Sequence, residues 1–149
     1  MQISASEPSP EIVKAVLLLA RRLRAARPEG SGTLSELSLL GTLHRLGEMP
    51  AARLAQEERL QPQSLTRLIA ALEKKGWIGR RRSYEDRREI MIAITGEGRA
   101  ALIRDIDARR EWLHRVMAQT LDERESAVLE EAAAIMLKLA GSEACHDDV

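Results

Sequence analysis

Hydrophobic positions in the first third of the chain follow the spacing of two amphipathic helices. Between Pro10 and about Arg27 the apolar residues recur at i, i+4, i+7, i+8 and i+11, the positions of one helix face. These residues are Ile12, Val16, Leu19, Ala20 and Leu23. The breaker-rich segment RPEGSG ends the pattern. A second helix is predicted from Thr33 to about Leu46, because Thr33 and Glu36 match a capping box.

Two short helices joined by a tight turn are predicted next. The first begins at Pro50 and stops before Leu60. Pro62 stands at the first position of the second, where its missing N–H costs little, and Gly76 is placed to end it. The apolar residues of the second helix share one face: Leu65, Leu68, Ile69 and Leu72. This is the pattern of a helix-turn-helix, although helical hairpins also occur in proteins that never touch DNA.

Two strands are predicted after the helix-turn-helix, in the segments WIGRRR and EIMIAIT at 77–82 and 89–95. Isoleucine occupies every second position from 90 to 94, which is the period of a half-buried strand. The polar loop between the strands, SYEDR, is too long for a two-residue turn. A basic hairpin directly after a helix-turn-helix is the layout of a winged helix.

Two more helices are predicted in the C-terminal part of the chain. Thr95 would cap the first, which runs to about Thr120, and Asp122 with Glu125 would begin the second, which runs to about Ala140. The last helix is apolar over more than one stripe: Val128, Leu129, Ala132, Ile135, Met136 and Leu139. Such breadth indicates that the first helix and the last two form a subunit interface as well as a core.

Composition narrows the class of protein. The chain has 149 residues, which is the size of a single domain, and residues 141–149 read as a polar tail. Phenylalanine is absent, so Leu, Ile, Val, Met and Ala must build the core, which favours helices. No stretch approaches the roughly 18 apolar residues of a membrane span. The N-terminus lacks the order of a signal peptide, and the single Cys145 fits a reducing compartment. A cytoplasmic protein is expected.

The charges are unevenly distributed, although the formal net charge is zero. Residues 53–88 hold ten Lys or Arg against five Asp or Glu, whereas residues 97–149 hold seven against twelve. A basic segment in a neutral chain indicates a local docking surface for an anion. Nucleic acid is the first candidate.

The start of the second short helix carries side chains that suit contact with DNA. They are Gln61, Gln63, Ser64, Thr66 and Arg67. Glutamine can pair with adenine, arginine with guanine, and hydroxyls with bases or phosphates, while the N-terminal amides of a helix favour phosphate. The alternative interpretation is an ordinary solvated helix start.

The hairpin, or wing, carries five arginines: Arg80, Arg81, Arg82, Arg87 and Arg88. On a protruding hairpin they can reach phosphates or enter a narrow minor groove, whose negative potential favours arginine. Asp86 is expected to pair with one of them and fix its direction. Tyr84 either contacts the DNA backbone or packs the loop. The alternative is a charged hairpin that only protects an edge strand from aggregation.

Two segments resemble the MarR (multiple antibiotic resistance regulator) family of bacterial winged-helix transcription factors. They are LQPQSLTRLIAALEKKGWI at 60–78 and RRRSYEDRREIMIAITGEGRA at 80–100, and the second holds the family's D-x-R motif from Asp86 to Arg88. The resemblance extends over nearly the whole chain, from about Glu11 to Ala140. It implies a mostly α fold with a small β-hairpin.

The resemblance also implies an arrangement and a function. The winged helix-turn-helix lobe would span 33–95, and dimerisation helices would span 11–32 and 96–140. Like its relatives, the protein would be a homodimer that binds double-stranded DNA at a palindromic operator, with the recognition helix in the major groove. Arg88 would enter the minor groove while Asp86 orients the wing. The expected role is that of a ligand-responsive repressor.

Relatives often respond to small phenolic or anionic effectors bound between the dimer helices and the DNA-binding lobe. The resemblance therefore makes Arg22, His44 and Trp112 candidate effector contacts. A lone tryptophan on a helix is more often a core or interface residue.

Other functional classes find less support in the sequence. No nucleophile, base and orienting group form a recognisable arrangement, and no glycine-rich phosphate loop is present, so an enzyme is not expected. His44 and His114 lack the additional ligands of a metal site, so neither metal nor cofactor is expected. Redox-sensing relatives use a cysteine near the first helices, and this chain has none there. The remaining alternative is a winged-helix module used for protein contacts or non-specific DNA binding.

Overall fold

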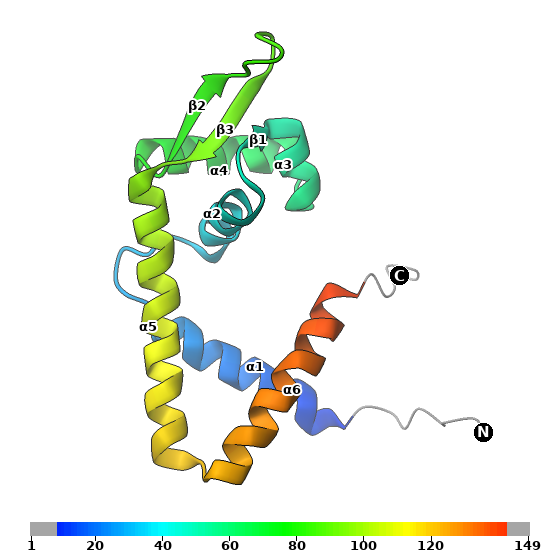
Figure 1. Ribbon diagram of the computed structural model, residues 1–149, viewed down its shortest axis with the longest axis vertical. Helices are drawn as coiled ribbons and strands as arrows, with labels where there is room; N and C mark the ends of the chain where they lie inside the picture. Colours follow the sequence, from blue (N-terminus) through cyan, green and yellow to red (C-terminus); the bar gives the residue numbers. More distant parts are fainter. Residues whose placement is uncertain (1–8, 143–149) are drawn as a thin grey trace, which may run out of the picture. The chain divides into compact units, whose positions relative to one another are not determined.

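The protein is described by a computed structural model that covers residues 9–142. These residues divide into two compact units, the first ending at Arg110 and the second beginning at Glu111, inside one long helix. The first unit holds α1 (Pro10–Ala25), α2 (Leu34–Leu46), α3 (Ala51–Glu57), α4 (Pro62–Lys74) and a small sheet (Figure 1). The helix that crosses the division is α5 (Gly96–Thr120), and α6 (Glu123–Gly141) follows in the second unit.

The helix boundaries have local causes that the sequence displays. Thr33 caps α2: its hydroxyl accepts from the Glu36 N–H at 3.2 Å, and the Glu36 carboxylate accepts from the Thr33 N–H at 2.7 Å. Asp122 and Glu125 form the same reciprocal pair at the start of α6. Pro62 opens α4, as predicted. The predicted mostly helical architecture is confirmed.

The sheet has three antiparallel strands, one more than predicted. The hairpin consists of β2 (Ile78–Arg82) and β3 (Ile90–Ile94), and its register runs from Ile78↔Ile94 to Arg82↔Ile90. The additional strand, β1 (Met49–Pro50), pairs with the other edge of β3, which makes β3 central. Strand β1 is not predictable from the sequence, because two residues, one of them a proline, show no alternating pattern.

A leucine-rich core holds the first unit together around α2. The completely buried apolar side chains come from α2, β1, α3, α4 and β3: Leu39, Leu40, Leu43, Met49, Leu54, Leu72 and Ile92. Their neighbours include Leu65, Ile69, Ile78 and Leu102. Because the helices and the hairpin share this core, α4 and the wing are fixed to the same scaffold.

Three buried or partly buried carboxylates connect elements within the first unit. Asp105 of α5 binds Arg27, which follows α1, at 2.6 Å. Glu36 of α2 binds Lys75 at the end of α4, also at 2.6 Å. Glu58, after α3, accepts hydrogen bonds from Ser38 and Thr42 of α2 at 2.8 and 2.5 Å. Each carboxylate has partners, as buried charge requires.

Helices α1 and α6 differ from the others because neither has a buried residue. Their exposed apolar side chains include Ile12, Val13, Val16, Leu17 and Leu18 on α1, and Val128, Ile135, Met136, Leu137 and Leu139 on α6. The described helices include none that is long and apolar enough to cross a membrane. Of the predicted polar tail, residues 143–149, which include Cys145, lie outside the described residues.

Candidate nucleic-acid interface

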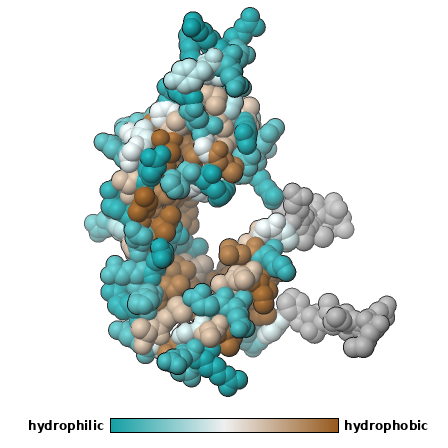
Figure 2. All heavy atoms as spheres, in the orientation of Figure 1, coloured by the Kyte–Doolittle hydropathy of each residue, from teal (hydrophilic) through white to brown (hydrophobic). Residues whose placement is uncertain are grey.

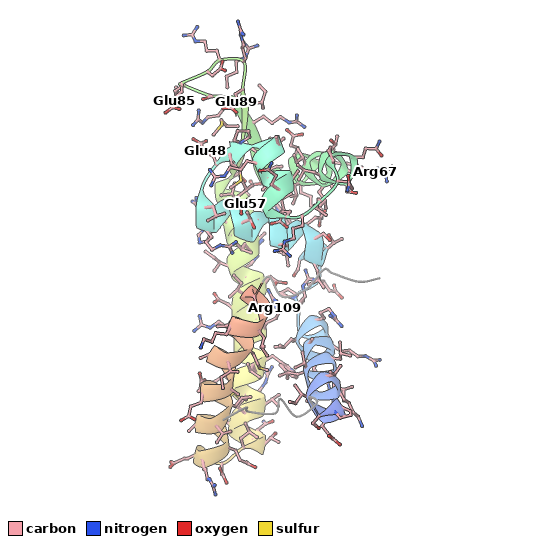
Figure 3. The ribbon with its side chains drawn as sticks, turned by 90° about the vertical axis from the view of Figure 1, so that its right-hand side faces the viewer. Glu48, Glu57, Arg67, Glu85, Glu89 and Arg109 are labelled. Atoms are coloured by element: carbon pink, nitrogen blue, oxygen red, sulfur yellow. The ribbon has the colours of Figure 1, made fainter. Side chains whose placement is uncertain are left out.

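The first turns of α4 separate a core face from a free polar face. Leu65, Ile69 and Leu72 are buried. The side chains proposed from the sequence are all exposed: Gln61, Gln63, Ser64, Thr66 and Arg67. Arg67 extends outward from α4 (Figure 3). Helical periodicity thus anchors one side of α4 and leaves the other side to meet a ligand.

The backbone at this helix start is suited to an anion. Gln61 is the N-cap residue, but its side chain makes no capping hydrogen bond, and the first turn contains no acidic residue. The first N–H groups of α4 therefore retain the positive end of the helix dipole without a carboxylate to neutralise it. Thr66 is already engaged, since its hydroxyl donates to the Pro62 carbonyl at 2.8 Å.

The turn before α4 is held by residues that the sequence analysis did not select. Glu58 is fastened to α2 by the two hydroxyl groups of Ser38 and Thr42. Arg59 has φ 52°, a left-handed conformation that is uncommon for a residue with a side chain. The Leu60 N–H then donates to the Ala55 carbonyl at 2.9 Å. The left-handed turn at Arg59 could not be predicted from the sequence, because a single charged residue shows no hydrophobic periodicity.

The wing loop closes through short hydrogen bonds. The Ser83 N–H donates to the Glu89 carbonyl at 2.9 Å, and the Glu89 N–H donates to the Asp86 carbonyl at 3.0 Å. The Asp86 carboxylate accepts from the backbone N–H of Arg88 at 2.9 Å. The expectation that Asp86 pairs with an arginine side chain is therefore corrected: among the described residues it forms no ion pair, because it is used inside the loop as an Asx-type acceptor.

The five wing arginines have different surroundings. Arg80 and Arg81 form ion pairs with Glu73 of α4 and with Glu48, which precedes β1. Arg82, Arg87 and Arg88 are exposed and have no ion pair within residues 9–142. Figure 3 shows nitrogen-tipped side chains extending from the wing near Glu85 and Glu89. The arginine-rich hairpin predicted from the sequence thus carries a net positive charge, since residues 80–89 hold five arginines against three acidic residues.

Tyr84 lies at the tip and is 89% exposed. Its ring faces the guanidinium of Arg81, with 4.3 Å between the Arg81 Cζ and the ring centroid. The ring therefore packs on a wing arginine and remains open to solvent. The cation–π contact combines with the Glu48 pair to hold Arg81 from two sides.

The candidate effector residues are not brought together within one unit. Arg22 and His44 are exposed side chains of the first unit, on α1 and α2, while Trp112 is half-buried in the second unit. A groove of about 690 Å³ lies elsewhere, between α3 and α4, with Ala55, Leu65 and Arg80 in its lining. Within the described part of the chain, no three His, Cys, Asp or Glu residues cluster as metal ligands would.

Comparisons with known proteins agree with this geometry. The MarR family profile matches residues 33–90. An uncharacterized HTH-type transcriptional regulator of Mycobacterium leprae is 37% identical over 126 residues, which cover 84% of this chain and 87% of that protein. An HTH-type transcriptional regulator of Mycobacterium tuberculosis is 38% identical over 125 residues, which cover 84% and 87% of the two chains.

A solved structure shows the same likeness. A transcriptional regulator protein from Pseudomonas aeruginosa has 34% sequence identity and a TM-score of 0.78, and the match covers 89% of this chain and 94% of that one. These relatives are transcriptional regulators, a class of proteins that are not enzymes. The exposed polar start of α4 and the basic wing therefore belong to a protein whose relatives regulate transcription. The chain belongs to the MarR family and is a DNA-binding transcriptional regulator.

Proposed function

We propose that this regulator is a cytoplasmic, ligand-responsive repressor that binds a palindromic operator as a homodimer. The observation that carries the proposal is the pairing of two unlike surfaces on one core: the uncapped polar start of α4 and the arginine-rich wing. A helix start of this kind fits the major groove and reads base edges, while arginines on a thin hairpin fit a minor groove.

Each exposed side chain has a role in this proposal. At the start of α4, Gln63 and Arg67 read base edges, and Gln61, Ser64 and Thr66 lie at the phosphates or at bases beside them. On the wing, Arg88 enters the minor groove. Its backbone is fixed by Asp86 through the 2.9 Å hydrogen bond, so the carboxylate orients the tip without neutralising the guanidinium. Tyr84, Arg82 and Arg87 complete the DNA-facing surface.

The homodimer is supported by the apolar surfaces of α1 and α6. Leu17 and Leu137 are 62% and 74% exposed, and they belong to continuous apolar stretches of their helices. Hydrophobic residues gather visibly on the α6 segment in Figure 2. Monomeric proteins rarely leave such patches open, because covering them stabilises an assembly by about 25 cal/mol per Å². A two-fold axis would give each half of a palindrome the same α4 and wing.

The effector part of the proposal concerns Arg22, His44 and Trp112. On the first unit, Arg22 would supply a cation and His44 a hydrogen-bonding ring for a small phenolic or anionic molecule. On the second unit, Trp112 is a separate candidate that would supply an aromatic surface. Such a molecule would release DNA if it bound the DNA-free state of the dimer more tightly than the DNA-bound state.

Selection of bound sequences from a random duplex library tests the proposal, with wild type and Gln63→Ala selected in parallel. The wild type should enrich an inverted repeat whose half-sites are about one helical turn apart. On that operator Gln63→Ala should lose about 1–3 kcal/mol, but little on random DNA. Enrichment of single half-sites, or of no sequence, would contradict the dimeric operator-binding function. Equal losses on both DNAs would remove Gln63 from base readout.

A further inference from the structure

Two of the five wing arginines are bound by carboxylates of the lobe that supports the wing. Arg80 donates through Nε to Glu73 Oε1 at 2.6 Å and through Nη2 to Glu73 Oε2 at 3.1 Å. This two-point contact connects β2 to the C-terminal half of α4. Paired N–H···O bonds of this kind fix direction as well as charge. The contact also raises the pKa of Arg80, principally through the Glu73 hydrogen bond.

Arg81 is held more completely than Arg80. Its Nε donates to Glu48 Oε2 at 2.7 Å, and its Nη2 pairs with Glu48 Oε1. A third N–H bonds the Arg82 carbonyl at 3.0 Å, and the ring of Tyr84 covers the guanidinium. Three of the five N–H donors of Arg81 are thus used inside the protein, and the hairpin is joined to the segment just before β1.

The other three arginines differ from Arg80 and Arg81 in their partners. Arg82, Arg87 and Arg88 are exposed, as Arg80 is, but they have no ion pair in the described part of the chain. Only the backbone of Arg88 is fixed, by Asp86. A free guanidinium adds its whole charge to a phosphate contact and releases a counterion, whereas a paired one must first give up its carboxylate.

We propose that Glu48 and Glu73 are positioning residues that hold the wing on the DNA-binding lobe through Arg81 and Arg80, and that only Arg82, Arg87 and Arg88 offer free positive charge to the DNA, at its phosphates or in its minor groove. The division rests on the proposed DNA-binding function. Pairing two of the five arginines lowers the positive charge that the wing offers to any duplex. Base contacts by α4 then supply a larger share of the binding free energy than they would if all five arginines were free.

The salt dependence of duplex binding separates the two groups of arginines. Arg88→Gln should reduce the slope of log affinity against log salt by about 0.9, the effect of one lost phosphate contact. The double variants Glu48→Gln/Arg81→Gln and Glu73→Gln/Arg80→Gln remove each pair without leaving an unpaired charge. Their slopes should equal the wild-type slope. Glu48→Gln alone should increase the slope by about 0.9, because it frees Arg81. A double variant that loses as much slope as Arg88→Gln would overturn the division.

A second measurement on the free protein tests the pairing without DNA. The ¹⁵N–¹H signals of the arginine Nε groups should show slow hydrogen exchange for Arg80 and Arg81 and fast exchange for Arg82, Arg87 and Arg88. In Glu48→Gln the Arg81 signal alone should join the fast group. Uniformly fast exchange would refute the positioning role. If the pairing is present but the wild type binds no duplex with salt dependence, it is the proposed DNA-binding function that fails.

Discussion

Gly98, in the first turn of α5, has the least room for a side chain among the glycines of the described residues. A Cβ at this position would lie 2.0 Å from the carbonyl oxygen of Trp77. The contact is tight because Thr95 fixes the helix start: its hydroxyl accepts from the Gly98 N–H at 3.0 Å and donates to the Gly76 carbonyl at 2.6 Å. Glycine therefore allows α5 to begin directly against the chain that leads into the wing.

Gly98→Ala should lower the free energy of unfolding by about 1–3 kcal/mol, the usual range for overpacking, because the obstacle is backbone that cannot turn aside. Gly41→Ala is the matched control. It lies inside α2 with nothing within 4 Å of the added Cβ, so it should stabilise by up to about 1 kcal/mol. Urea denaturation of the two variants measures both. An unchanged Gly98→Ala midpoint would contradict the packing of α5 on Trp77.

Glu36 makes the stability of the first unit depend on pH. Burial by itself raises the pKa of Glu36, but hydrogen bonds from the Lys75 ammonium and the Thr33 N–H outweigh it, so the pKa lies below its ordinary value of 4.5. A carboxylate with a lowered pKa stabilises the fold above the unfolded-state pKa, and this contribution is lost as the pH falls through the folded-state pKa.

Lys75→Gln should therefore reduce the slope of unfolding free energy against pH between about pH 5 and 3. The reason is that the folded-state pKa of Glu36 rises when the ammonium is removed, so fewer protons are taken up on unfolding. Denaturation at a series of pH values provides the measurement. A variant profile that runs parallel to the wild-type profile through this window would show that Glu36 does not depend on Lys75.

At the scale of elements, Asp105 connects the segment after α1 to α5. It is completely buried and binds Arg27, whose guanidinium also donates to the Gly32 carbonyl at 2.7 Å. Arg109 pairs with its second oxygen from the next helical turn. One carboxylate thus fixes the chain between α1 and α2 against the helix that follows the wing.

Asp105→Ala should lower the free energy of unfolding by about 3–5 kcal/mol, because it leaves Arg27 partly buried and unpaired. Asp107→Ala, two residues further along the same helix and exposed, should change it by no more than about 0.5 kcal/mol. Thermal unfolding of Asp105→Ala and Asp107→Ala measures both free-energy changes. Similar small losses for both would mean that the buried ion pair does not hold these elements together.

The elements that the sequence predicted correctly are those with local signals. Capping at Thr33 and Asp122, proline at the first turn of α4 and alternating isoleucines in β3 act within a few residues, so they can be read directly. The pairs of Arg81 with Glu48 and of Arg80 with Glu73 could not, because they depend on strand register and helix placement. The prediction that Asp86 pairs with an arginine side chain was wrong for a related reason: the loop geometry places its carboxylate against the backbone N–H of Arg88.

For the molecule as a whole, the exposed apolar residues of α1 and α6 are the surfaces of the proposed homodimer. If the proposal holds, Leu137→Asp should convert that homodimer into a folded monomer, since an aspartate buried in an apolar interface costs several kcal/mol. Glu131→Gln, also exposed on α6, should remain a dimer. Analytical ultracentrifugation distinguishes the two states, and far-UV circular dichroism verifies folding. A dimeric Leu137→Asp protein would exclude this part of α6 from the interface.

The distribution of charge along the neutral chain also affects how the molecule meets DNA. Residues 53–88, which include α4 and most of the wing, hold ten Lys or Arg against five Asp or Glu, whereas residues 97–149 hold seven against twelve, so the excess positive charge lies in the segment of α4 and the wing. Affinity should consequently depend on how α4 and the wing meet the duplex together and not on long-range attraction by the whole protein.

Cleavage of operator DNA by a tethered iron chelate shows whether the start of α4 and the wing tip bind DNA side by side. The chelate would be attached to a cysteine at Gln63 or at Tyr84 in a Cys145→Ser background. We expect two separate cleavage clusters in each half-site, one from each position, mirrored about the operator centre. Cleavage by neither probe, or the same diffuse pattern from both, would contradict the account.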